Sequence, residues 1–160
     1  MTENDVKFIA DATLGKLVKW LRILGYDTVT WWGRAERPFL RQAAADERVA
    51  LTRRRDLAGR QFSGRLVVIR SEQIEEQLPE LLARLSLCPQ EERFFSRCLK
   101  CNAPLRKVSR EEVEGKVPSY IWETSAKFRA CPRCGGIFWP GTHRRNMEAL
   151  LNARTVSRHS

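Results

Sequence analysis

Two pairs of cysteines in this chain have the spacing of metal ligands. Cys98 and Cys101 form the first pair, and Cys131 and Cys134 form the second. Each pair places two thiolates on one tight turn, and two such turns can close a tetrahedral four-sulfur site around Zn2+. Two glycines follow the second pair and permit the left-handed backbone that such a turn needs. The cysteines therefore predict a structural zinc site; four buried thiols or two disulfides are the alternative.

The segment between the two pairs is longer than a minimal zinc ribbon requires. It runs for 29 residues, from residue 102 to residue 130, so we expect it to hold an additional strand or short helix. A short helix is also expected over residues 144–151. Because such a ribbon has little apolar core of its own, metal binding should supply most of its folding energy. Loss of zinc is then expected to unfold the ribbon and to leave the rest of the chain intact.

The charge of the chain indicates a polyanionic partner. The 29 Lys and Arg residues outnumber the 19 Asp and Glu residues, which gives a net charge of +10. Residues 1–93 hold 16 cations against 14 acids (net +2), whereas residues 94–160 hold 13 against 5 (net +8). A small, strongly basic, metal-bound unit is typical of proteins that bind RNA or DNA. A basic surface that is simply solvated is the alternative.

The start of the chain and its apolar segments indicate a cytoplasmic protein with no membrane partner. No basic N-terminal segment precedes an apolar stretch, and no apolar run approaches the roughly 18 residues of a membrane span. Thiols committed to a metal also fit a reducing compartment.

Short apolar strands alternate with amphipathic helices over the first half of the chain. This alternation predicts an α/β fold with a parallel sheet and helices on both faces. The expected strands are residues 7–11, 28–31, 48–52 and 66–69, and the expected helices are residues 14–24, 38–45 and 72–87.

Three acidic residues are expected near one edge of this sheet. Asp11 ends the first strand, Glu36 precedes the second helix, and Asp56 follows the third strand. Ligands of open α/β sheets bind outside the carboxyl ends of the strands. Carboxylates gathered there could hold Mg2+ or Mn2+, which activates water for phosphodiester cleavage. Each acid alone is more often a helix cap or a turn residue, with the exception of Asp11, which ends a buried strand directly before a helix.

Several short motifs occur in an order that resembles a known family. They are FIADATLGKLVKWLRILGYDT from residue 8, LTR at 51–53, EQL at 76–78, RCLKCN at 97–102 and FWPGTH at 138–143. Together they resemble the mutator-seven C-terminal RNase domain, a PIN-like nuclease fold fused to a zinc ribbon. The resemblance implies a Rossmann-like, PIN-like α/β domain over about residues 5–90 and a four-cysteine zinc ribbon over about 94–150. It also implies RNA cleavage at an acidic, divalent-metal centre.

The acidic centre departs from the family pattern. Asp11 lies where the family has its first acid, but only Glu36 remains where the family usually shows a pair. Arg54 occupies the position of another expected acid, and Asp56 is either its substitute or a turn residue. An arginine cannot ligate Mg2+, and its charge opposes metal binding. The cluster of Arg53, Arg54 and Arg55 is instead suited to phosphate, which guanidinium groups bind bidentately.

Aromatic residues lie among cations near the end of the chain. Trp139 and His143 precede Arg144 and Arg145, a combination that can stack unpaired bases and contact phosphates. A role in the small core of the ribbon is the alternative for Trp139, and a structural role is the alternative for His143. The tryptophan pair at residues 31–32 is a second candidate stacking surface, with partial burial as its alternative.

Three functional hypotheses follow from the sequence. The first is an RNA-binding protein on a ribonuclease-like scaffold, with tRNA and the ribosome among the candidate targets. The second is a Mg2+- or Mn2+-dependent endoribonuclease that uses Asp11, Glu36 and Asp56. The third is a protein-interaction module for an acidic partner.

Overall fold

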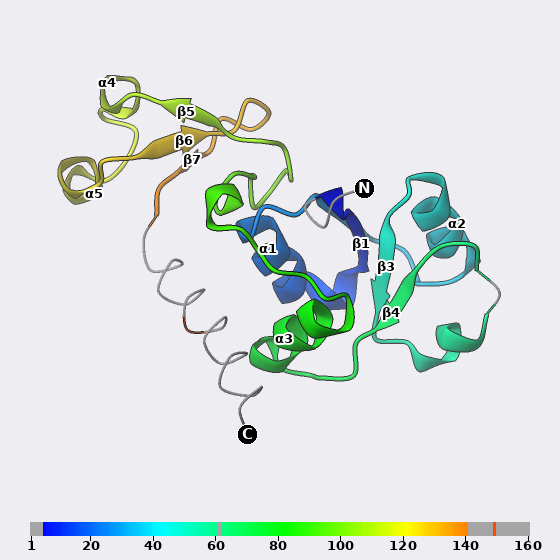
Figure 1. The fold of residues 1–160 in the computed structure, drawn as a ribbon. Helices are drawn as coiled ribbons and strands as arrows, with labels where there is room; N and C mark the ends of the chain where they lie inside the picture. Colours follow the sequence, from blue (N-terminus) through cyan, green and yellow to red (C-terminus); the bar gives the residue numbers. More distant parts are fainter. Residues whose placement is uncertain (1–4, 61, 141–148, 150–160) are drawn as a thin grey trace.

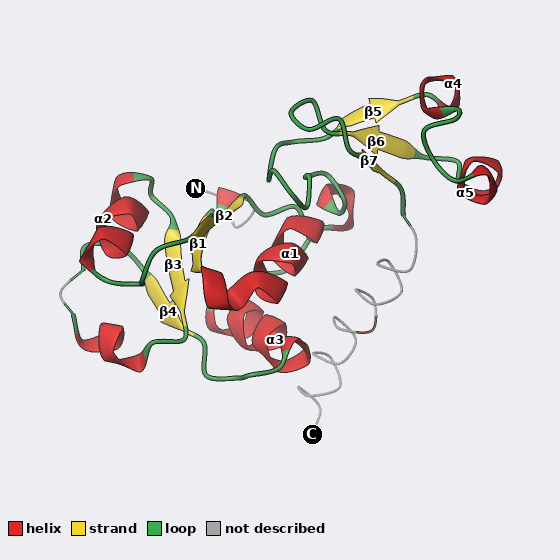
Figure 2. Ribbon diagram, turned by 180° about the vertical axis from the view of Figure 1, so that it is seen from behind, coloured by secondary structure: helices red, strands yellow, loops and turns green. Residues whose placement is uncertain are grey.

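The computed structural model describes residues 5–60, 62–140 and 149. Four parallel strands form its first sheet, in the order β2-β1-β3-β4 (Figures 1 and 2). Both central strands are fully buried, because their apolar side chains face helices on either side. The strands are β1 (Phe8–Asp11), β2 (Thr28–Trp31), β3 (Val49–Thr52) and β4 (Leu66–Val68).

Helices cover both faces of this sheet, as the alternation of elements predicts. Helices α1 (Gly15–Ile23) and α3 (Ile74–Arg84) pack on one face, where their leucines share a core with Phe8 and Leu51. Helix α2 (Arg37–Ala45) packs on the other face. Figure 1 shows α1 and α3 on one side of the strands and α2 on the other.

Three short 3-10 helices connect these elements. They are η2 (Ala12–Leu14), which leads from β1 into α1, η3 (Arg55–Gly59), which follows β3, and η4 (Glu91–Arg93), which follows α3. Helix α3 is shorter than the predicted range 72–87. It ends near Ser86, whose positive φ of 53° cannot continue a right-handed helix. We call residues 8–93 the α/β unit.

The second sheet is antiparallel, with strand order β5-β6-β7. It consists of β5 (Arg106–Val108), β6 (Phe128–Ala130) and β7 (Ile137–Phe138). The segment between β5 and β6 holds two short helices, α4 (Arg110–Val113) and α5 (Ser119–Thr124), which confirms the predicted insertion. We call residues 97–138 the ribbon. The helix predicted over 144–151 lies outside the described residues.

The ribbon lies against the end of α1, beside the amino-terminal edge of the first sheet (Figures 1 and 2). The connecting chain is fixed there, because the Phe95 amide donates to the Ile23 carbonyl over 2.8 Å and Arg97 Nε donates to the Gly25 carbonyl over 3.2 Å. Gly25 adopts a φ of +95°, and a Cβ there would lie 2.4 Å from the Arg93 carbonyl oxygen. Only glycine fits this position. None of the helices within the described residues combines the length and apolar character needed to cross a bilayer.

Candidate metal centre and nucleic-acid interface

The four predicted cysteine ligands come together in the ribbon. Their sulfur atoms all lie within 4.8 Å of one another, and the Sγ atoms of Cys98 and Cys134 are 3.8 Å apart. A disulfide requires about 2.05 Å, so these sulfurs are unbonded thiols. Amides of the two turns donate to the sulfurs over 3.4 Å, including Cys101 to Cys98 and Cys134 to Cys131. Four converging sulfurs with such donors fit a tetrahedral metal ion such as zinc.

The thiols of this cluster differ in acidity. Burial raises the pKa of Cys131, but the amides of Cys134 and Arg133 donate to its thiolate and lower the pKa to about 7. The pKa of Cys101 is raised to about 12, first through its contact with the Cys134 side chain. Metal binding must therefore release protons from the cluster, which makes the affinity for the metal pH-dependent.

Each turn places a residue in the left-handed region directly after its second cysteine. Gly135 has a φ of 73°, as the sequence predicts, and Asn102 has a φ of 65°. Asparagine tolerates this conformation better than most residues. Its side chain leaves the ribbon: Oδ1 accepts from the Thr28 amide over 3.0 Å, and Nδ2 donates to Asp27 Oδ1 over 2.6 Å. Asn102 therefore joins the first cysteine turn to the start of β2.

Two further side chains strengthen this junction. Arg22 of α1 is 9% exposed; its Nε donates to the Thr28 carbonyl over 2.9 Å and its Nη1 to the Leu99 carbonyl over 2.7 Å. Asp27 also accepts from Arg48 Nη1 over 2.8 Å. Burial raises the pKa of Asp27, but hydrogen bonds from Arg48 and Asn102 outweigh it and lower the pKa. The contacts of Asn102 and Arg22 that cross from the ribbon to the α/β unit leave no sequence pattern, because their partners are 74 to 77 residues apart.

The first candidate acid lies at the carboxyl edge of the sheet, opposite the ribbon. Asp11 ends β1 at the point where the chain turns to β2 on one side and later to β3 on the other. Ligands of α/β sheets bind at such switch points. The carboxylate is 8% exposed; Oδ1 accepts from the Thr13 amide over 3.0 Å and Oδ2 from Thr52 Oγ1 over 3.1 Å.

Arg54 lies between the other two candidate acids. Its Nε and Nη2 donate to the two oxygens of Asp56 over 3.2 and 2.7 Å, and its Nη1 lies 3.9 Å from Glu36 Oε1. Nη1 also donates to the Ala35 carbonyl over 3.0 Å. The hydrogen bond from Arg54 is the main reason why the pKa of Asp56 is lowered. The guanidinium group of Arg54 thus lies between the carboxylates of Glu36 and Asp56.

These acids do not fit a divalent cation in the conformation of the structure. Both oxygens of Asp11 already accept hydrogen bonds, and Asp56 is engaged by Arg54. Within the described parts of the chain, only the cysteine cluster gathers three or more metal-ligating side chains closely enough to share an ion. We therefore derive no catalytic step through Mg2+ or Mn2+ at this edge.

The remaining candidate RNA contacts are dispersed. Arg53 Nη2 lies 3.7 Å from Glu72 Oε1, and Arg55 opens η3 with an exposed side chain. Trp139, which directly follows β7, is partly buried. His143, Arg144 and Arg145 lie outside the described residues. The ribbon lies at the amino-terminal edge of the first sheet, whereas residues 53–55 follow β3 at the carboxyl edge. The two groups of candidate RNA contacts are therefore on opposite edges.

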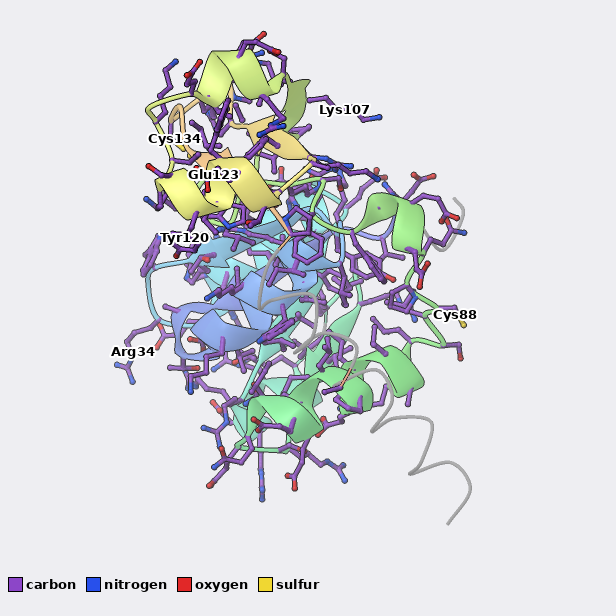
Figure 3. The ribbon with its side chains drawn as sticks, turned by 90° about the vertical axis from the view of Figure 1, so that its left-hand side faces the viewer. Arg34, Cys88, Lys107, Tyr120, Glu123 and Cys134 are labelled. Atoms are coloured by element: carbon purple, nitrogen blue, oxygen red, sulfur yellow. The ribbon has the colours of Figure 1, made fainter. Side chains whose placement is uncertain are left out.

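The tryptophan pair at residues 31–32 has one partly buried and one exposed member. Trp31 packs against Phe39 with ring centroids 6.0 Å apart, and its Nε1 donates to the Arg34 carbonyl. Trp32 is 84% exposed. Arg34, two residues further along the chain, extends away from the body of the protein (Figure 3). Of these two rings, that of Trp32 is the one open to solvent.

The chain thus joins a parallel α/β sheet, with a carboxylate at its switch point, to a four-cysteine ribbon that can hold a metal ion such as zinc. The chain matches the family model described as the Mut7-C RNAse domain over residues 6–151, and it belongs to this family. The curated proteins and the solved structures that were compared with the chain gave no match.

Proposed function

We propose that this protein binds RNA on a PIN-like ribonuclease scaffold whose acidic centre no longer assembles around a divalent metal. Membership of an RNase domain family supports an RNA-related role. The observation that carries the proposal is the position of Arg54, which donates to both oxygens of Asp56 and lies 3.9 Å from Glu36.

Arg54 can exchange its carboxylate partner for a phosphate. Its side chain is 33% exposed and that of Asp56 is 55% exposed, so the ion pair is accessible to an incoming anion. Exposed pairs of this kind contribute little to stability. A phosphodiester group offers the same bidentate geometry as a carboxylate. Arg53 and Arg55 flank Arg54 and supply further positive charge.

The rival function is metal-dependent RNA cleavage. Asp11 favours it, because this carboxylate ends β1 at the switch point of the sheet. Cleavage of this kind would require Arg54 to leave its present partners. The same proposal includes three points that stay predictions. They are a cytoplasmic location, a structural role for zinc, and tRNA or the ribosome as the RNA target.

The test compares RNA binding and metal binding in wild-type protein, Arg54→Asp and the matched control Arg65→Asp. Arg65 is an exposed cation at the amino end of β4, away from the candidate acids. We expect wild-type protein to bind single-stranded RNA equally well in EDTA and in Mg2+, as measured by fluorescence anisotropy. Arg54→Asp should lose about tenfold in RNA affinity, because a charge-assisted phosphate contact is worth about 1.5–3 kcal/mol. It should also bind Mn2+ more tightly, as measured by paramagnetic resonance.

Two outcomes would contradict the proposal. RNA binding by the wild-type protein that disappears in EDTA would show that a divalent ion holds the RNA. Robust metal-dependent cleavage by wild-type protein that is lost in Arg54→Asp would make Arg54 part of an active centre. An Asp11→Asn variant then identifies the carboxylate on which that cleavage depends.

A further inference from the structure

Two adjoining hollows lie beside the free edge of β4. One, of about 530 Å3, is bounded by α2 and by residues near position 62; the other, of about 620 Å3, is bounded by η3, β4 and the end of α3. Arg60 and Phe62 line both hollows, so the two form one continuous surface. We call this surface the arginine groove, after its lining residues Arg37, Arg41, Arg55, Arg60, Arg70 and Arg84.

The arginine groove is strongly positive. No acidic residue is among the residues that line either hollow. Arg84 lies 3.4 Å from Glu80, but no ion pair within the described residues engages the other five arginines. All six arginines are exposed. Six of the 16 cations in residues 1–93 therefore gather on one surface, although the net charge of this part of the chain is only +2. Such a concentration of one charge attracts polyanions.

The edge of β4 is unsuited to an added peptide strand. Arg65 and Ile69 hydrogen-bond toward β3, so the backbone of Val68 faces away from the sheet. Arg84 Nη1 already donates to the Val68 carbonyl over 2.5 Å. A peptide that extends a sheet needs a free ladder of backbone groups. This edge is three residues long and its Val68 carbonyl is taken, so an acidic peptide is the weaker candidate for the groove.

Phe62 gives the groove a fixed aromatic surface. Its ring is partly buried against the core below α2. The ring also lies over Gly64, where an added Cβ would be 2.6 Å from the Phe62 Cζ atom. Cations along a groove with an aromatic face among them are the usual features of a single-stranded nucleic acid site.

The groove begins at the carboxyl edge. Arg55 lines it and directly follows Arg54, so an RNA strand held by Arg54 can continue past Arg55 toward Phe62. We propose that the arginine groove binds the backbone of single-stranded RNA, from the carboxyl edge along β4 to α2. This proposal rests on the proposed RNA-binding function and extends it to a surface where the sequence indicated no site.

The experiment measures binding of a labelled oligouridine RNA of about twelve nucleotides, within the site sizes known for single strands. It uses the full-length, zinc-loaded protein over a range of salt concentrations. The test variant is Arg60→Ala/Arg70→Ala, and the matched control is Lys19→Ala/Arg65→Ala, which removes two exposed cations outside the groove. Phe62→Leu removes the ring and keeps an apolar side chain. Thermal unfolding confirms that each variant is folded.

We expect the test variant to lose about tenfold or more in affinity. The slope of log affinity against log salt should fall by about 1.4, because each phosphate contact contributes about 0.7 for single strands. The control should bind like wild-type protein. Phe62→Leu should weaken binding by about fivefold or more, through the loss of base stacking.

Three results would overturn the proposal. If the test variant binds like wild-type protein while Arg54→Asp is impaired, the groove is not the RNA contact and the proposed function stands. If the wild-type protein binds no RNA, both proposals fail. If a polyglutamate peptide of equal charge binds the groove more tightly than the RNA does, the groove is a site for an acidic protein.

Discussion

At the scale of single residues, Arg54 engages the candidate acids at the carboxyl edge of the sheet. The family resemblance implies that a cation stands where the family has an acid, and the structure adds that this cation holds Asp56 and approaches Glu36. The sequence could not show these contacts, because Asp56 and Glu36 are brought to Arg54 by η3 and by the segment before α2. The roles proposed for Asp11, Glu36 and Asp56 in chemistry stay predictions.

The four cysteine ligands could be named from the sequence, whereas Asn102 could not. The spacing of each cysteine pair fixes a local turn, and local geometry is what sequence patterns encode. Asn102 matters through its contacts with Asp27 and Thr28, which depend on the packing of the ribbon against α1. The signals for Asn102 in the sequence are its place directly after Cys101, where a left-handed residue is needed, and its membership of the motif RCLKCN.

We expect Asn102→Gly to separate metal binding from docking. Glycine keeps the left-handed backbone, so the zinc content should stay at one ion per chain. The buried Thr28 amide then loses its acceptor, which should cost about 1–3 kcal/mol of stability. Metal analysis and urea unfolding measure the two effects.

Gly135→Asn is the matched control for this change. It places asparagine at the equivalent position of the second turn, where a Cβ would meet no atom within 4 Å. Its stability should stay within about 1 kcal/mol of wild-type protein, because asparagine tolerates a positive φ. Equal losses in the two variants would show that the turns, and not the docking contacts, carry the effect.

At the scale of elements, Glu80 organises the connection from β4 to α3. Its carboxylate accepts from the amides of Arg70 and Ser71 and from the Ser71 hydroxyl, at 2.9–3.3 Å. Burial raises the pKa of Glu80, but these donors and Arg84 outweigh it and lower the pKa below its ordinary value of 4.5. Strand β4 and helix α3 could be predicted from the pattern of apolar residues. The contact of Glu80 with the loop at residues 70–71 could not, because a hydrogen bond to a loop about ten residues earlier leaves no periodic signal.

We expect Glu80→Gln to destabilise the protein by about 1–2 kcal/mol at neutral pH, through the loss of charge-assisted hydrogen bonds. The wild-type contribution is fully present above pH 4.5, because the folded pKa is the lower one. It disappears as the pH falls below 4.5 and the carboxylate is protonated. Urea unfolding of both proteins across this range should therefore show a difference that shrinks in acid.

Glu76→Gln is the control on the same helix. Glu76 is exposed in the first turn of α3, so its loss should change stability by about 0.5 kcal/mol or less. A difference between wild-type protein and Glu80→Gln that stays constant down to strongly acidic pH would contradict the assignment of the depressed pKa.

At the scale of the whole molecule, the division into an α/β unit and a zinc ribbon can be predicted from the composition of the sequence. The hydrogen bonds that couple the two units cannot. The sequence alone suggests that the ribbon folds around its metal and that the α/β unit is independent of it. In the structure, Arg22 donates to the Leu99 carbonyl beside the cysteines, and Asn102 accepts from the start of β2. The metal site is thus hydrogen-bonded to the amino edge of the sheet.

Removal of zinc is therefore expected to loosen β2 as well as the ribbon. Structural zinc supplies the folding energy of such turns. Without metal, the first cysteine turn should lose its fixed conformation and no longer hold Asn102 and Leu99 in position. The Thr28 amide loses its acceptor and Arg22 loses one carbonyl. The Ile69 amide, which donates to the Thr52 carbonyl at the opposite edge over 2.8 Å, is an internal reference.

Hydrogen exchange followed by NMR, before and after chelation, measures this coupling at both amides. The protection factor of the Thr28 amide should fall by about tenfold or more, which corresponds to a loss of about 1.4 kcal/mol or more in the free energy of local opening. The protection factor of the Ile69 amide should change much less. Cys131→Ser should reproduce the effect without a chelator. If the Thr28 amide keeps its protection while the ribbon amides lose theirs, the two units fold independently. The hydrogen bonds of Asn102 and Arg22 would then form on docking without stabilising β2. If both amides lose protection equally, the chain unfolds as one cooperative unit around its metal.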